Sequence, residues 1–138
     1  MYNRKATFDY QLLDNFTAGI ILNGKEVKAI REDKASFGDS YCFIINNEIF
    51  LKKFHISVKD GEEKDTLRDR KLLLNKKEIL KISKAIKEKG LTVIPLSLYI
   101  NKTGLIKLEI YLAKGKNEKN KKEKLKEKDL KRELSYNL

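Results

Sequence analysis

The feature that most constrains the fold is the alternation of apolar and polar residues in the segment LIKLEIYLA. Its regularly spaced apolar positions are Ile106, Leu108, Ile110 and Leu112. A period of two residues is typical of a β-strand with one face in a core and the other in solvent. The preceding segment LTVIPLSLYI is also rich in strand-forming residues, and residues 101–104 lie between the two. We therefore predict that these segments form an antiparallel pair.

A second hairpin is predicted over residues 41–54. The runs YCFII and EIFLKKF flank Asn46 and Asn47, and asparagine tolerates the positive φ angles that a tight two-residue turn requires. Residues 8–22 are rich in aromatic and β-branched side chains, which predicts a further strand with a bend at Gly19. Pro95 has no N–H to donate, so the strand that contains it should have a bulge or lie at a sheet edge.

Two helices carry clear start signals. Asn75 can cap a helix, Glu78 stands at the third position of a capping box, and Gly90 ends the segment. A shorter helix is predicted after Asn23, again with a glutamate, Glu26, at the third position. Several short strands with two or three helices predict a mainly β fold with some α. Its simplest form is a small antiparallel β-barrel of the oligonucleotide-binding type with flanking helices.

The chain is strongly basic, with 31 Lys and Arg against 20 Asp and Glu in 138 residues, and a net charge of +11. The stretch that begins at Lys114 holds ten basic and five acidic side chains and few apolar ones. Too little apolar surface is present there to repay the entropy of ordering the segment alone. We predict a body over residues 1–113 and a basic tail over residues 114–138 that is disordered when free. The charge favours a polyanionic partner, and nucleic acid first.

Catalysis and membrane binding find little support in the sequence. One histidine and one cysteine, His55 and Cys42, are too few for a zinc site or for a nucleophile with its base. We therefore predict no enzymatic activity, no metal and no cofactor. A lone cysteine cannot form an internal disulfide, and no segment approaches the ~20 apolar residues of a membrane span. The expectation is a cytoplasmic, monomeric protein without membrane attachment.

Five ordered blocks carry a resemblance to a known family. They are NRKA from Asn3, AGIILNGKEVKAIR from Ala18, DSY from Asp39, RKLLLNKKEI from Arg70 and LAKGK from Leu112. In order and spacing they resemble the SsrA-binding protein family, also called small protein B, the partner of transfer-messenger RNA. The match runs over residues 3–132. It implies a barrel of the oligonucleotide-binding type, no enzymatic activity, and a role in trans-translation, which rescues bacterial ribosomes stalled on messages without a usable stop codon.

The resemblance also implies a division of labour between body and tail. The family's body binds the tRNA-like domain of transfer-messenger RNA, and the two enter the ribosomal A site with the protein in the place of an anticodon arm. Shape, phosphate and 2′-hydroxyl contacts suit Arg and Lys on a rigid body. The family's tail enters the mRNA channel of the small subunit downstream of the decoding centre and becomes helical there when no message occupies the path.

The matching blocks assign candidate contacts residue by residue. On the body these are Asn3, Arg4, Lys5, Glu26, Lys28 and Arg31, with Arg70, Lys71 and Lys107 as weaker candidates. In the tail the residues assigned to the ribosomal channel are Lys114, Lys116, Lys119, Lys121, Lys122, Lys124, Lys126, Lys128, Lys131 and Arg132. The plainer interpretation of each is ordinary solvated charge, and Glu26 could instead serve only as the capping partner of its helix.

Two departures from the family pattern limit this transfer. Thr17 stands where the family commonly has glutamate before the Ala-Gly pair, and a hydroxyl replaces only part of a carboxylate. The tail after Lys116 lacks the aromatic or histidine that family members often have, so stacking from that position is lost. Two alternatives stay open: a general RNA-binding or ribosome-associated protein without specificity for transfer-messenger RNA, and an RNA-processing enzyme, for which no acid-base or metal constellation is found.

Overall fold

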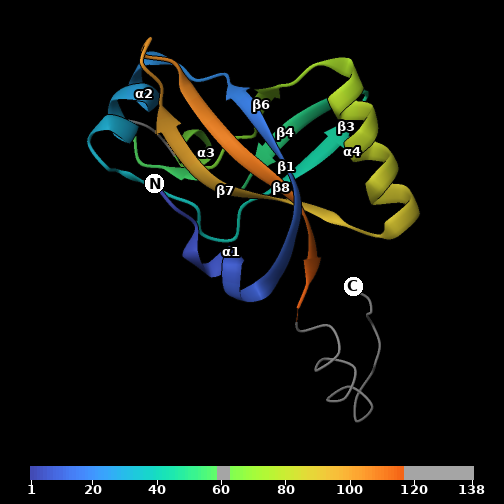
Figure 1. Ribbon diagram of the computed structural model, residues 1–138. Coiled ribbons are helices and arrows are strands. Elements are labelled where there is room, and N and C mark those ends of the chain that lie inside the picture. The colour runs from blue at the N-terminus through green and yellow to red at the C-terminus, as the bar shows by residue number, and fades with distance from the viewer. Residues whose placement is uncertain (59–62, 117–138) are drawn as a thin grey trace.

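Six antiparallel strands form the main body of the molecule (Figure 1). In the computed structural model, which describes residues 1–58 and 63–116, β1 (Tyr10–Ile20) pairs with both β6 (Arg70–Leu73) and β8 (Ile106–Gly115). The other strands of this sheet are β3 (Tyr41–Ile45), β4 (Glu48–Lys52) and β7 (Thr92–Ile100). The strand order β1-β6-β4-β3-β7-β8 closes on itself as a barrel. The prediction of a mainly β fold with a few helices is confirmed.

Both predicted hairpins are present. In the β3–β4 hairpin, Asn46 and Asn47 have φ angles of 52° and 62°, as the two-residue turn requires. In the β7–β8 hairpin the register shifts between Pro95 and Ser97, so the proline lies at a bulge as predicted. Gly19 lies in a continuous part of β1, where it pairs with Leu73 on one side and Lys107 on the other.

The two predicted capping boxes are also present. Helix α2 (Gly24–Arg31) starts at Asn23, whose side chain accepts from the Glu26 amide while the Glu26 carboxylate accepts from the Asn23 amide. Helix α4 (Lys76–Lys89) repeats this arrangement with Asn75 and Glu78. It ends at Gly90, which has a φ of 64° and the left-handed conformation that glycine adopts without strain.

Several short elements were not predicted. Residues 4–9 form helix α1 (Arg4–Asp9), so the strand expected from residue 8 begins only at Tyr10. Strand β6 was missed because RKLLLN has too few residues to show a period. Two further strands, β2 (Ala35–Ser36) and β5 (His55–Ile56), pair beside the barrel, and α3 (Glu63–Thr66) is a single turn.

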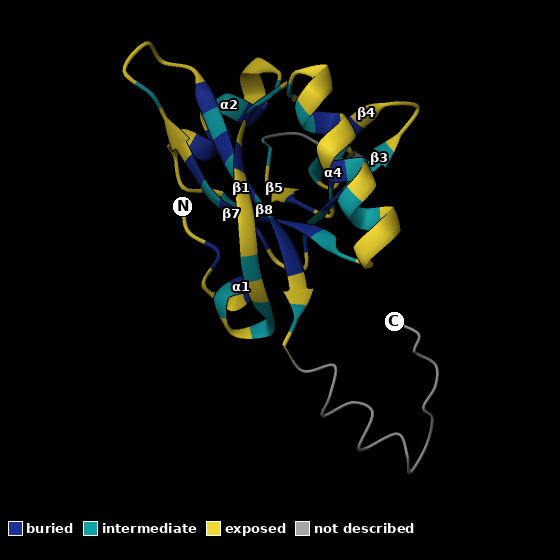
Figure 2. Cartoon of the chain, turned by 45° about the vertical axis from the view of Figure 1, so that its right-hand side comes forward, coloured by how far each residue is buried: buried dark blue, intermediate teal, exposed yellow. Residues whose placement is uncertain are grey.

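The apolar faces of the strands meet inside the barrel, and α4 packs against it (Figure 2). Buried side chains come from every strand around the ring, among them Ala18, Cys42, Ile49, Leu51, Leu72, Val93, Leu108 and Ile110. Strand β3 pairs with β7 only at Cys42 and Val93, and Ile79 and Ile82 of α4 join the same core. Burial raises the pKa of the Cys42 thiol. Among the described residues, no helix is long and apolar enough to cross a membrane.

The boundary predicted between body and tail falls inside a strand. Strand β8 continues through Gly115, and the amide of Lys116 donates to the Asp9 carbonyl at 2.9 Å. Lys114 and Lys116 therefore belong to the barrel. The other tail residues, for which disorder and ribosome contacts were predicted, lie outside the described residues.

Candidate nucleic-acid interface

A buried ion cluster joins α2 to β6. The Glu26 carboxylate, which is 1% exposed, accepts from Arg68 Nη2 at 2.5 Å and from Arg70 Nε at 2.9 Å. Arg70 is itself 0% exposed and donates to the carbonyls of Phe54, Arg68, Asp65 and Thr66 at 2.6–3.1 Å. Every donor direction of its guanidinium therefore has protein acceptors.

The pKa values of Glu26 and Arg70 are both shifted downward, for different reasons. Burial alone would raise the pKa of Glu26. Hydrogen bonds from Arg68 and the Asn23 amide, together with the charge of Arg70, lower it by more than burial raises it, so the net shift is downward. Burial lowers the pKa of the Arg70 guanidinium, which the neighbouring carboxylate opposes. Glu26 and Arg70, assigned from the sequence as RNA contacts, are buried and bound to each other in this structure, where they connect α2 to β6. Their assignment to RNA stays a prediction.

Asn3 is also buried, and its assignment to RNA likewise stays a prediction. Its side chain is buried, where Nδ2 donates to the Pro95 carbonyl at 2.8 Å and Oδ1 accepts from the Ala6 amide at 3.3 Å. Asn3 thus caps α1 and fixes it to β7. Arg4 and Lys5, which follow it, are exposed, and Lys5 donates to Asp39 at 2.7 Å. That contact raises the pKa of the Lys5 ammonium.

The remaining assigned cations do not form one cluster; those on the helices are exposed, and Lys71 and Lys107 are partly exposed. Arg4 and Lys5 lie on α1 before β1, whereas Lys28 and Arg31 lie on α2 after it. The two pairs are separated by an 11-residue strand, roughly 35 Å at ~3.3 Å per residue (Figure 1). A partner that contacts both pairs must therefore extend over roughly this distance.

Lys107 lies in a row of side chains that crosses four strands on the outer face of the barrel. The register aligns Tyr99 of β7 with Lys107 of β8, Lys107 with Gly19 of β1, and Gly19 with Leu73 of β6. Tyr99 is 45% exposed and Leu73 is 53% exposed. A Cβ at Gly19 would lie 3.5 Å from the Leu73 Cβ, so Leu73 packs over the glycine backbone. We call Gly19, Leu73, Tyr99 and Lys107 the outer-barrel patch.

A carboxylate adjoins this patch in the next row. Thr17 of β1 aligns with Glu109 of β8, which aligns with Ser97 of β7. The Glu109 carboxylate accepts from Asn15 Nδ2 at 2.9 Å and from Ser97 Oγ at 3.4 Å. The family pattern would place a carboxylate at Thr17, and this chain holds one directly across the strand pair, where an RNA hydroxyl or amino group could donate to it.

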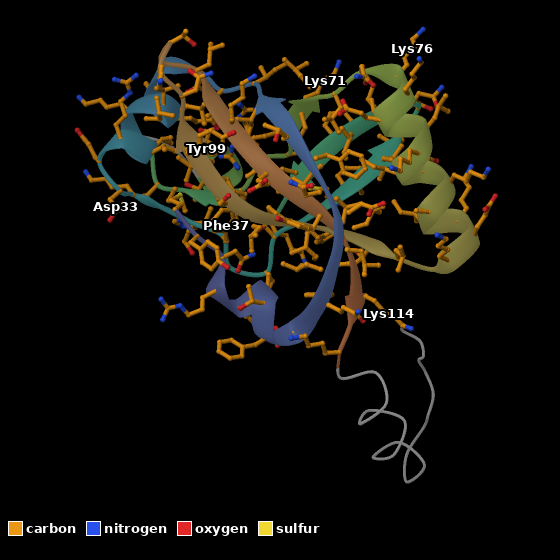
Figure 3. All side chains as sticks on the ribbon, viewed as in Figure 1. Asp33, Phe37, Lys71, Lys76, Tyr99 and Lys114 are labelled. Carbon is orange, nitrogen blue, oxygen red and sulfur yellow. The ribbon has the colours of Figure 1, made fainter. Side chains whose placement is uncertain are left out.

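Sequence reasoning found Lys107 and Lys71 but not Tyr99 or Leu73. Lys71 lies two residues before Leu73, is partly exposed, and donates to Glu48 at 2.6 Å (Figure 3). Leu73 could have been found from the sequence only by placing Leu72 in the core, because the next residue of a strand must then face outward. Within the described part of the chain, no group of three or more His, Cys, Asp or Glu side chains is placed to hold a metal ion.

A small basic barrel that exposes an aromatic ring, a cation and apolar side chains in one row has the character of a nucleic-acid-binding module. Comparison with known proteins narrows this class. The family model described as "SmpB protein" matches residues 1–138, and this chain belongs to that family.

Curated relatives and a solved structure agree with this assignment. The SsrA-binding protein of Bacteroides thetaiotaomicron is 46% identical over 136 residues, which cover 96% of this chain and 91% of that protein. The SsrA-binding protein of Thermosipho africanus is 45% identical with the same coverage. A solved chain described as "tmRNA-SmpB: a journey to the center of the bacterial ribosome" has a TM-score of 0.69 and 37% identity, with 84% of this chain and 83% of that chain covered.

Proposed function

We propose that this protein binds the tRNA-like domain of transfer-messenger RNA through its barrel and acts with it in trans-translation on stalled ribosomes. The observation that carries the proposal is the outer-barrel patch, in a chain that belongs to the SmpB family. The closed strand order and its outward-facing patch support a barrel of the oligonucleotide-binding type. Binding, rather than chemistry on the RNA, is the activity proposed.

The side chains of the patch suit folded RNA. Tyr99 offers a ring on which an unpaired base can stack, and Lys107 beside it can neutralise a phosphate. Leu73 supplies an apolar contact for a ribose or base, and Gly19 lets that side chain lie close to the sheet. Glu109 can accept a hydrogen bond from a 2′-hydroxyl, which distinguishes RNA from DNA. Arg4, Lys28 and Arg31 are proposed as phosphate contacts farther along the same RNA.

The basic tail is proposed to act on the ribosome rather than in RNA capture. Lys114 and Lys116 place its root at the end of β1 that carries α1, where the Lys116 ammonium donates to the Thr7 carbonyl at 2.8 Å. We propose that the basic residues beyond residue 116 occupy the mRNA channel of the small subunit, whose phosphate-lined walls suit lysine. The protein would then act in the cytoplasm, where ribosomes are found.

A competition gel shift tests the binding function. The tRNA-like domain is titrated with protein in the presence of excess tRNA, with Tyr99→Ala plus Lys107→Gln as the test variant. Loss of one stacked base and one phosphate contact should weaken binding at least about tenfold. The matched control is Ile45→Ala plus Lys53→Gln, which removes a comparable exposed apolar side chain and one charge elsewhere on the barrel, and it should bind like the wild type.

Three outcomes separate the possibilities. Equal displacement by tRNA would identify a general RNA-binding protein and reject the specificity proposed. Wild-type affinity in a folded Tyr99→Ala, Lys107→Gln variant would reject the patch as the binding site. Removal of residues 117–138 should leave this affinity nearly unchanged but abolish tagging on a non-stop message in a reconstituted translation system.

A further inference from the structure

Helix α4 carries a basic face that the proposed contacts do not use. Six of its 14 residues are lysines, all exposed. At about 100° per residue, five of them project within an arc of about 140° on the side away from the barrel. These five, which we call the lysine face, are Lys76, Lys77, Lys81, Lys84 and Lys87. Leu80, which is 62% exposed, lies in the middle of them.

Contacts within the protein leave this charge almost uncompensated. Lys81 lies 3.7 Å from the Asp14 carboxylate, and both side chains are more than half exposed. For the other four lysines the structure shows no ion pair with any residue in the ranges 1–58 and 63–116. Of the two helix carboxylates, Glu78 is engaged in the capping box, which leaves Glu88 as the acidic residue on this side of α4.

Folding does not require such a face. The buried side of α4 is formed by other residues, chiefly Ile79 and Ile82. Lysines three or four positions apart, such as Lys77 with Lys81 and Lys81 with Lys84, repel one another and oppose helix formation. Alternating signs would have stabilised the same surface, so the excess of five lysines over Glu88 points to a negatively charged partner.

The lysine face begins close to the outer-barrel patch and continues along β1. Leu73 ends β6, and α4 begins only three residues later at Lys76, which points away from the barrel (Figure 3). Along the helix, Lys81 reaches Asp14 of β1, the strand that also contains Gly19 of the patch. Asp14 lies five residues before Gly19, roughly 16 Å along the strand at ~3.3 Å per residue. A molecule bound across the patch would therefore meet the start of the lysine face first and would reach Lys81 by extending along β1.

We propose that the lysine face binds the phosphate backbone of a duplex segment of transfer-messenger RNA that adjoins the part held by the outer-barrel patch. This inference rests on the proposed function. The helix is about 21 Å long at ~1.5 Å per residue, enough to follow several phosphates along a groove. Lys81 lies over the ring of Phe16, 5.8 Å from its centroid, but Phe16 is only 8% exposed and offers a base little surface to stack on. The lysines therefore neutralise phosphates and do not read bases, so this contact adds affinity that is independent of RNA sequence and sensitive to salt.

Salt dependence provides the test. Binding of the tRNA-like domain with its adjoining stem is measured from low to physiological salt for wild type and for Lys77→Gln, Lys84→Gln, Lys87→Gln. Glutamine keeps helix propensity, and none of these lysines has an ion pair within the described chain to lose. Each lost phosphate contact should reduce the slope of log K against log salt by about 0.9, so the slope should become less steep by roughly 2 to 3.

A second triple variant controls for net charge. Lys52→Gln, Lys53→Gln, Lys89→Gln removes the same charge from β4, from the residue after it, and from another side of α4. It should retain nearly the wild-type slope. Equal slopes in the two triple variants would overturn the inference and leave long-range attraction as the cause. If the wild type itself fails to bind the RNA, the proposed function fails instead, so the two failures are distinguishable.

A tethered probe locates the contact. Cys42 is the single cysteine and is buried, so Lys84→Cys introduces the accessible thiol needed to attach a photo-crosslinker. Crosslinks to the stem of the RNA in the binary complex are expected. Thr103→Cys, in the β7–β8 loop, gives the reference pattern at another exposed position. Crosslinks from position 84 that form only when ribosomes are added would overturn the assignment to transfer-messenger RNA and indicate ribosomal RNA.

Discussion

Helices α2 and α4 both begin with a capping box, but the glutamate of the box has different partners in the two helices. Each starts at an asparagine, and three residues later a glutamate closes the capping box, with hydrogen bonds of 2.8–3.1 Å in both. Glu78 of α4 does only this. Glu26 of α2 also accepts from Arg68 and Arg70 and is buried, whereas Glu78 is partly exposed. The same four-residue signature therefore has a local role in one helix and a tertiary role in the other.

The difference follows from what faces each helix start. Arg70, on a strand 44 positions from Glu26, is itself buried and needs a carboxylate, because an unpaired guanidinium in the interior would be strongly destabilising. No such cation faces Glu78 among the described residues. Glutamates at the same position of a capping box thus differ in whether they also form a buried ion pair.

The largest expected effect comes from Glu26→Ala. It leaves Arg70 buried without its carboxylate and should lower the free energy of unfolding by about 3–5 kcal/mol. Glu78→Ala, which removes the same residue type from the same position of a capping box, should cost about 1 kcal/mol or less. Urea unfolding followed by circular dichroism measures both. Similar losses in the two variants would show that capping, not the ion cluster, accounts for the role of Glu26.

Lowering the pH should test the ion cluster of Glu26, Arg68 and Arg70 by protonating Glu26 in the wild-type protein. The folded-state pKa of Glu26 is lowered, so its contribution to stability is fully present above its ordinary value of about 4.5 and is lost as pH falls through the folded value. Glu26→Gln lacks this contribution at every pH. The difference in unfolding free energy between wild type and Glu26→Gln should therefore shrink below about pH 4.5. A difference that stays constant from pH 6 to pH 3 would contradict the assignment.

Much of this fold could be predicted because the decisive signals are local. The asparagine turn at Asn46, the capping boxes, Gly90 and the bulge near Pro95 depend on residues within a few positions of each other, and all are present. The burial of Glu26 depends on Arg70, far along the chain, and no local pattern encodes that meeting. For the same reason the sequence assigned both residues to RNA, although the structure buries them.

The candidate interface, like the fold, could be predicted only in part. Lys107 was named from the sequence as a weaker candidate although it lies outside the five family blocks, and its neighbours in space depend on strand register. Tyr99 and Leu73 come from strands on either side of it, and Leu73 comes from a strand that was not predicted. A one-residue error in register would have turned these side chains to the opposite face.

The smallest expected loss of unfolding free energy comes from removing the asparagine N-cap, which both helices have. Asn23→Ala and Asn75→Ala each remove a side-chain acceptor for the amide of the third helical residue, Glu26 or Glu78, at 2.9 Å and 2.8 Å respectively. Both asparagines are exposed, and neither contacts Arg70. Each substitution should therefore cost about 1 kcal/mol of unfolding free energy, measured under the conditions used for the glutamate variants. If Asn23→Ala costs as much as Glu26→Ala, the cap must hold the carboxylate in the cluster, and the two roles of Glu26 are coupled. If the two asparagine variants agree while the two glutamate variants differ severalfold, the roles are separable, because what distinguishes α2 from α4 then lies in the partners of the glutamate and not in the cap.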